Sequence, residues 1–139
     1  MIVLDTNVLS EALRPVPERP VLDWLADQPS GSLFTTTVTR GEILYGIRLL
    51  SDGKRRKGLW DAANKIFDED FAGHVLSFDG DAADMYADIA ASRRIAGKPI
   101  SQFDAMIAAM ARSRGAILAT RNVKDFESCG IEVVNPWTA

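Results

Sequence analysis

The segment Ile2-Val-Leu-Asp-Thr-Asn-Val-Leu-Ser10 indicates what architecture to expect from this 139-residue chain. Its first three residues are apolar and favour a strand, whereas Asp5, Thr6 and Asn7 interrupt the run with side chains typical of a turn. We predict a buried strand over residues 2–4, a polar turn at its carboxyl end and a short helix directly afterwards. Similar runs predict four further strands: Ser32 to Thr37, Val75 to Phe78, Ala116 to Thr120 and Ile131 to Val134.

Between these strands the apolar residues follow the spacing of helices. Such stripes fall within residues 43–50, 59–67, 82–90 and 103–110, and a further short helix is expected around Val21 to Ala26. Alternating strands and helices predict the α/β class, with a short central parallel β-sheet of four to five strands flanked by helices on both faces. We expect one domain over residues 1–139.

The composition limits the possible functions. Hydrophobic residues make up 47% of the chain, and no run approaches the roughly 18 apolar residues of a membrane span. The single cysteine, Cys129, cannot form an internal disulfide, which fits a cytoplasmic location. Because the net charge is −3, a nucleic-acid substrate would require local basic residues or metal ions.

Four polar residues are expected where the carboxyl ends of the strands meet the amino ends of the helices, which is the edge at which such sheets bind ligands. Asp5 directly follows the first strand, and Asn122 lies just past the fourth. We place Glu42 in the first turn of the helix after the second strand, and Asp104 in the first turn of the helix before the fourth. If the three carboxylates converge, their repulsion raises their pKa values unless a cation offsets it.

Carboxylates without accompanying His or Cys favour Mg²⁺, with Mn²⁺ as a substitute, over zinc. A Mg²⁺ ion keeps several waters, so a few carboxylates suffice, and the site would support hydrolysis of phosphodiester bonds. Helix capping is the simpler explanation for each acid taken alone. Asp5 can cap the first helix, and Thr39 to Glu42 and Ser101 to Asp104 both match a capping box. Convergence of the acids is what distinguishes the two explanations.

Four blocks of the sequence resemble the PIN domain, and more narrowly the VapC-type toxins of bacterial toxin-antitoxin pairs, including the FitB-like branch. The resemblance extends over essentially the whole chain, in the order and spacing of the family, and the ending Asn135-Pro-Trp137 is also similar. The blocks are Ile2 to Ser10, Thr37 to Gly46, Phe103 to Ala109 and Ala119 to Phe126.

The resemblance implies a Mg²⁺- or Mn²⁺-dependent endoribonuclease toxin that hydrolyses RNA and is neutralised by a cognate VapB-like antitoxin. Asp5 and Asp104 match the principal metal ligands, and Glu42 completes the cluster or orients the attacking water. Asn122 stands where part of the family has an Asp, and Asp125 is an alternative for that role. The implied assembly is a homodimer or a toxin-antitoxin hetero-oligomer, in which the C-terminal segment of the antitoxin covers the active site.

Substrate contacts are predicted for Thr6, Asn7 and Arg121, which belong to the same edge. The only basic run, Lys54 to Lys57, is either a contact with the RNA backbone or a solvated helix face. The three tryptophans are expected to pack in the core rather than to stack on bases. They are Trp24, Trp60 and Trp137.

Other function classes fit less well. A nucleotide-binding protein would have a glycine-rich turn after the first strand, and neither GxGxxG nor a P-loop occurs. Phosphotransfer through an aspartyl phosphate would be helped by a second acid where Asn7 stands. A PIN-like binding module without catalysis is the main alternative. The presence of all three carboxylates argues against it, and Asn122 keeps it open.

Overall fold

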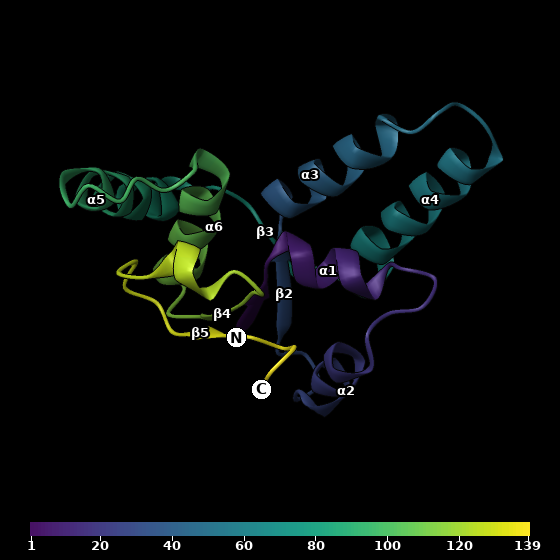
Figure 1. Ribbon diagram of the computed structural model, residues 1–139, viewed down its shortest axis with the longest axis horizontal. Coiled ribbons are helices and arrows are strands. Elements are labelled where there is room, and N and C mark those ends of the chain that lie inside the picture. The colour runs from purple at the N-terminus through teal and green to yellow at the C-terminus, as the bar shows by residue number, and fades with distance from the viewer.

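Five short parallel strands form the centre of the molecule, in the order β3-β2-β1-β4-β5 (Figure 1). The computed structural model describes residues 1–139. The predicted α/β class and parallel sheet are confirmed, and β1 has the predicted bounds, whereas the other strands are shorter than expected. The strands are β1 (Ile2–Leu4), β2 (Leu33–Thr36), β3 (Val75–Leu76), β4 (Ile117–Ala119) and β5 (Val133–Val134).

Helices cover both faces of the sheet, with α5 and α6 on one side and α1 to α4 on the other (Figure 1). None of them is long and apolar enough to cross a membrane. A π-helical turn that the sequence did not predict, η1 (Ile66–Asp70), continues α4, and a 3-10 turn, η2 (Val123–Phe126), follows β4. The α-helices are α1 (Thr6–Ala12), α2 (Arg19–Asp27), α3 (Thr37–Arg48), α4 (Lys54–Lys65), α5 (Gly80–Ile95) and α6 (Gln102–Ser113).

The central strand is buried on both faces, which explains its continuous apolar sequence. Val3 packs into the core formed with α5 and α6, whereas Ile2 and Leu4 pack into the core formed with α1, α3 and α4. All three residues are at most 8% exposed. Because the strand cannot shift without exposing these side chains, the residue that follows it is held at a fixed depth.

The start of α3 differs from the sequence prediction. Thr36, rather than Thr39, is the N-cap, and its hydroxyl accepts a 3.0 Å hydrogen bond from the backbone N–H of Thr39. Helix α3 therefore begins at Thr37, and Glu42 lies in its second turn instead of its first. The capping box predicted for Thr39 to Glu42 is wrong, because an earlier threonine provides the cap.

The start of α6 follows the prediction. Ser101 caps the helix by accepting a hydrogen bond from the N–H of Asp104, which lies in the first turn. At the other end Gly115 adopts a φ of 63°, a conformation that glycine tolerates without steric cost. The chain then turns directly into β4, so α6 and β4 bring Asp104 and the residues after Ala119 to the same edge.

Candidate active site

The carboxyl edge of the sheet gathers the sequence-predicted acids around Asp5. This residue follows β1, is 4% exposed and donates its backbone N–H to the carbonyl oxygen of Ala119 at 2.9 Å. Helices α1, α3 and α6 all begin at this edge, so their N–H groups face it. The edge is therefore where strand ends, helix starts and carboxylates coincide.

Three hydrogen-bond donors orient the carboxylate of Asp5. Its Oδ1 caps α1 by accepting the N–H of Thr6 at 2.8 Å. Its Oδ2 accepts the hydroxyl of Thr120 at 2.7 Å and the side-chain amide of Asn7 at 3.2 Å. Asp5 thus caps a helix, as the capping explanation predicts. Its second oxygen accepts hydrogen bonds from Thr120 and Asn7, which helix capping does not require.

Burial raises the pKa of Asp5 from 3.8 to about 6, against the hydrogen bonds from Thr120 and Thr6, which lower it. The negative charges of Asp104 and Glu42 add to the rise. The chain supplies no compensating charge, because no Lys or Arg forms an ion pair with any of these three acids. Asp104 and Glu42 are therefore each near enough to Asp5 for their charges to act on it, and no cation of the chain offsets them.

Glu42 is held by threonines of two helices. The hydroxyl of Thr6 donates to Oε1 of Glu42 at 2.8 Å and lies 3.1 Å from the hydroxyl of Thr39. Thr39 is in turn 3.3 Å from the hydroxyl of Thr36, the α3 cap. This chain of hydroxyls connects α1 to α3 and fixes where the Glu42 carboxylate lies, although Glu42 is one helical turn later than predicted.

Asp104 is half-buried at the start of α6. Burial raises its pKa above the ordinary value of 3.8, the hydrogen bond from Ser101 lowers it, and the charge of Asp125 raises it again. Asp125 therefore lies near Asp104, on η2, whereas it is not among the charges acting on Asp5. Asp125 is therefore a fourth acid at the border of the site. Asn122 and Asp125 were the two predicted alternatives for this position.

The residues after β4 adjoin the site but are more exposed. The backbone N–H of Asn122 donates to the hydroxyl of Thr120 at 3.1 Å, while its side chain makes no hydrogen bond within the chain. The N–H of Arg121 donates to Oδ1 of Asn7 at 3.2 Å, and its guanidinium lies 5.0 Å from the ring centre of Trp137. Of the three predicted substrate contacts, Thr6 and Asn7 already bind carboxylates of the site, and Arg121 borders it.

The donor set fits a hard divalent cation that keeps much of its water. No group of three His, Cys, Asp or Glu side chains is close enough to enclose an ion. Mg²⁺ rarely needs such a cage, because one or two carboxylates, waters and substrate phosphates complete its coordination. Asp5, whose oxygens are oriented by hydrogen bonds, and Asp104 both have raised pKa values and match that requirement.

Two threonines that the sequence analysis did not assign to the site are central to it. Thr120 joins Asp5, Asn7 and Asn122 through one hydroxyl, and Thr39 joins Thr6 to the α3 cap. Both are fully buried. A threonine that directly follows a buried strand, as Thr120 does, was the available signal, but threonine is common in strands for other reasons.

Several further polar and aromatic residues stabilise the packing of the helices and the sheet. Arg112 pairs with Asp88 at 2.7 Å and Arg114 with Asp79 at 3.5 Å, so these two arginines link α6 to α5. The three tryptophans are partly buried against the core, as expected. His74 stacks on Phe34, and its Nδ1 lies 2.9 Å from the carbonyl oxygen of Leu33.

The raised pKa of Asp5 predicts how the stability of the metal-free protein varies with pH. The folded state holds the Asp5 proton more tightly than the unfolded state, so its contribution is present below pH 4 and is lost as pH rises through 6. In EDTA, the free energy of unfolding of the wild type should fall by about 2.4 kcal/mol between pH 4 and pH 7 relative to Asp5→Asn. Urea unfolding at several pH values measures this difference.

The exposed acid Asp61 on α4 offers a matched control. Asp61→Asn should follow the wild-type profile, since its side chain is in water in both states. A constant difference between wild type and Asp5→Asn across the range would contradict the assignment of a charged, desolvated Asp5.

Comparisons with known proteins agree with this geometry. The family model for the PIN domain matches residues 2–130. The plasmid stability protein StbB of Pseudomonas syringae pv. tomato is 42% identical over 139 residues, which are 100% of both chains. The VapC ribonuclease Y4jK of Sinorhizobium fredii is 39% identical, covering 99% of this chain and 98% of that protein.

A third relative has a counterpart among solved structures. Toxin FitB of Neisseria gonorrhoeae is 36% identical, covering 99% of each chain. The crystal structure of FitAcB from the same organism superposes with a TM-score of 0.93 at 36% identity, covering 100% of both chains. The fold, the acidic edge and these similarities together show that the chain belongs to the PIN-domain family, among its VapC and FitB toxins.

Proposed function

We propose that this protein is a metal-dependent endoribonuclease toxin, acting in the cytoplasm as a single PIN domain over residues 1–139 and neutralised by a cognate VapB-like antitoxin. The ribonuclease and toxin activities are those named for its relatives Y4jK and FitB. The observation that carries the proposal is the buried carboxylate of Asp5, raised to a pKa of about 6 beside Glu42 and Asp104, with no cation of the chain to balance it.

The surroundings of each carboxylate suit it to a different role, either metal binding or orientation of the attacking water. Asp5 and Asp104 would hold Mg²⁺, or Mn²⁺ as a substitute, because their oxygens face the same edge. When bound, the cation offsets charge on the scissile phosphate and lowers the pKa of a coordinated water. Thr120 and Asn7 keep Oδ2 of Asp5 in place by donating to it, so the carboxylate needs little reorganisation.

Glu42 is suited to handle the attacking water. One of its oxygens, Oε1, accepts the hydroxyl of Thr6, which leaves Oε2 without a partner within the chain. A water bound there can be oriented toward the phosphorus and can pass its proton to the carboxylate. Asn122 contributes a neutral side chain next to Thr120, and Arg121 supplies a positive charge for the substrate backbone beside Asn7.

An antitoxin can cover this edge because an apolar groove opens beside it. The groove has a volume of about 650 Å³ and is lined by residues of α3 and by Phe103, with Glu42 at its border. Tyr45 and Phe103 are 66% and 52% exposed in this groove, and exposed apolar side chains that share a groove are typical of an interaction site. A C-terminal antitoxin segment would bury these rings and place a basic side chain on the acids, in a homodimer of toxins or a toxin-antitoxin hetero-oligomer.

The first prediction of this proposal concerns RNA cleavage. Purified, antitoxin-free protein should cut a mixed pool of structured and single-stranded RNAs with Mg²⁺ or Mn²⁺ and not with EDTA. Asp5→Asn and Asp104→Asn should each lower the rate more than about 100-fold. Thr120→Val should lower it by roughly 10–100-fold, because Thr120 orients the Asp5 carboxylate and does not itself bind the metal. Gel analysis of the cut ends measures the rates. Asp61→Asn is the control, and full activity of Asp5→Asn would refute the proposal.

The second prediction concerns metal binding without turnover. Because metal binds only the folded acidic edge, Mg²⁺ or Mn²⁺ at about 100 times its dissociation constant should add about 2.7 kcal/mol to the free energy of unfolding. Thermal unfolding followed by circular dichroism measures the change. Asp5→Asn should remove the increase, and an unchanged melting temperature of the wild type up to millimolar metal would count against the site.

The third prediction concerns the antitoxin. In the complex, amide hydrogen exchange should slow at the start of α6 and along α3 near Tyr45, because the antitoxin segment covers both. An Arg of that segment should lie against the carboxylates, and its replacement by Ala should restore cleavage. A crystal structure of the co-purified complex with the acidic edge fully open would overturn this arrangement.

A further inference from the structure

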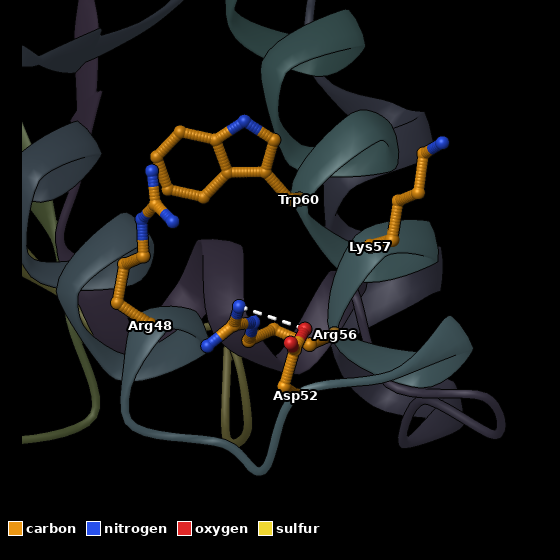
Figure 2. A pocket seen from close by; sticks show the side chains of 5 residues that line it. All are labelled: Arg48, Asp52, Arg56, Lys57 and Trp60. Atoms are coloured by element: carbon orange, nitrogen blue, oxygen red, sulfur yellow. Dashed lines mark hydrogen bonds and ion pairs between the residues drawn. The ribbon is translucent and has the colours of Figure 1, made fainter.

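A second polar pocket lies at the turn between α3 and α4, away from the acidic edge. It has a volume of about 230 Å³ and is lined by Arg48, Asp52, Arg56, Lys57 and Trp60 (Figure 2). Arg48 comes from the end of α3, and Trp60 rises from the second turn of α4. The function proposed for the acidic edge uses none of these residues.

This segment is the strongest local concentration of positive charge in the chain. Residues 48–57 contain five cationic side chains and one carboxylate, a charge of +4. The whole chain carries −3, so the other residues together carry −7. Only Arg56 has an acidic partner, Asp52 at 2.9 Å, and that carboxylate is 90% exposed. The unpaired cations are Arg48, Lys54, Arg55 and Lys57.

The cations lie where the fold itself disfavours them. Lys54 to Lys57 form the first turn of α4, at the positive end of the helix dipole, and this turn contains no acid. Gly53 precedes the helix and has no side chain to cap it. Acidic residues would stabilise this position, so four consecutive cations favour an anionic ligand from outside the chain.

One cation is already oriented for such a ligand. The guanidinium of Arg48 lies 4.3 Å from the ring centre of Trp60, which is itself packed against the core (Figure 2). This cation–π contact restricts the movement of the guanidinium while leaving its N–H groups without a carboxylate partner. A planar donor fork of this kind matches the oxygens of a phosphodiester better than it matches a single point charge.

We propose that this pocket binds the phosphate backbone of the RNA substrate outside the cleavage centre, an inference that rests on the proposed ribonuclease function. The acidic edge repels phosphates before metal binds, so much of the attraction for RNA must come from another part of the surface. Arg48 is six residues beyond Glu42 on α3, roughly 9 Å along the helix axis. Between the two sites lies a groove that is lined by Thr6 and Glu42 of the acidic edge and by Leu50 and Leu59, the latter next to Trp60 in the sequence.

The test measures RNA affinity separately from cleavage. Binding of a mixed-sequence single-stranded RNA about 20 nucleotides long would be followed by fluorescence anisotropy in EDTA, at several salt concentrations. Arg48→Gln with Lys57→Gln should weaken binding at least about tenfold and reduce the salt slope by about 1.4, or 0.7 for each lost phosphate contact.

Controls separate charge from packing and from total charge. Lys57→Gln alone leaves Trp60 and Arg48 in contact and should reduce the salt slope by about 0.7, the value for one lost phosphate contact. Lys65→Gln with Arg94→Gln removes two exposed, unpaired charges elsewhere and should change neither affinity nor slope. Unchanged RNA affinity in both pocket variants, or equally tight and equally pocket-dependent binding of polyglutamate, would overturn the assignment to RNA phosphates.

The outcomes for the two sites can be told apart. If wild type cleaves RNA and the pocket variants bind it normally, the pocket inference fails and the ribonuclease stands. If wild type binds RNA through the pocket but never cleaves any RNA with metal, the ribonuclease fails and the pocket stands. Absence of RNA binding by wild type would overturn the pocket inference, whatever the cleavage assay shows.

Discussion

The burial of an ionisable carboxylate directly after the central strand is the constraint on which the rest of the site depends. Because β1 packs against cores on both faces, Asp5 cannot move outward to water without exposing Ile2, Val3 and Leu4. The fold answers with hydrogen bonds instead of a counter-charge. The donors come from α1 and from the end of β4, and therefore the position of Asp5 ties together segments that are more than a hundred residues apart.

Keeping Asp5 ionised without a cation opposes folding by about 3 kcal/mol, given a pKa of about 6 instead of 3.8. That is a large part of the 5–15 kcal/mol by which a domain is usually stable. A protonated Asp5 would remove the cost but would also remove the ligand. The arrangement is reasonable if the acid is neutralised in use, and the helix starts around it reduce the cost, since Asp5 and Asp104 both lie where helix dipoles favour negative charge.

The sequence predicts the parts of this site that depend on burial and fails where several similar residues compete. The bounds of β1 were predictable because a strand buried on both faces has a continuous apolar sequence. The start of α3 was not, because Thr36, Thr37 and Thr39 are all acceptable caps and only the register of β2 selects the first. The error moves Glu42 by one turn, yet Glu42 still reaches the edge through the hydroxyl of Thr6. The role of Thr120 depends on a contact across 115 residues, for which no local pattern exists.

Helix α3 connects two regions of opposite charge, the acidic edge at its beginning and the basic first turn of α4 beyond its end. Near its beginning Asp5 caps α1, Asp104 lies in the first turn of α6, and Glu42 accepts a hydrogen bond from Thr6, so helix starts and hydrogen bonds supply part of what a cation would. Beyond its end the cations of α4 face an unfavourable dipole, and only Arg56 has a carboxylate. The cations beyond the end of α3 cannot neutralise the acids near its beginning, because the rigid helix keeps the two groups of charges apart. The same rigidity gives any extended polyanion a fixed distance between the point where it is held and the point where the acids act.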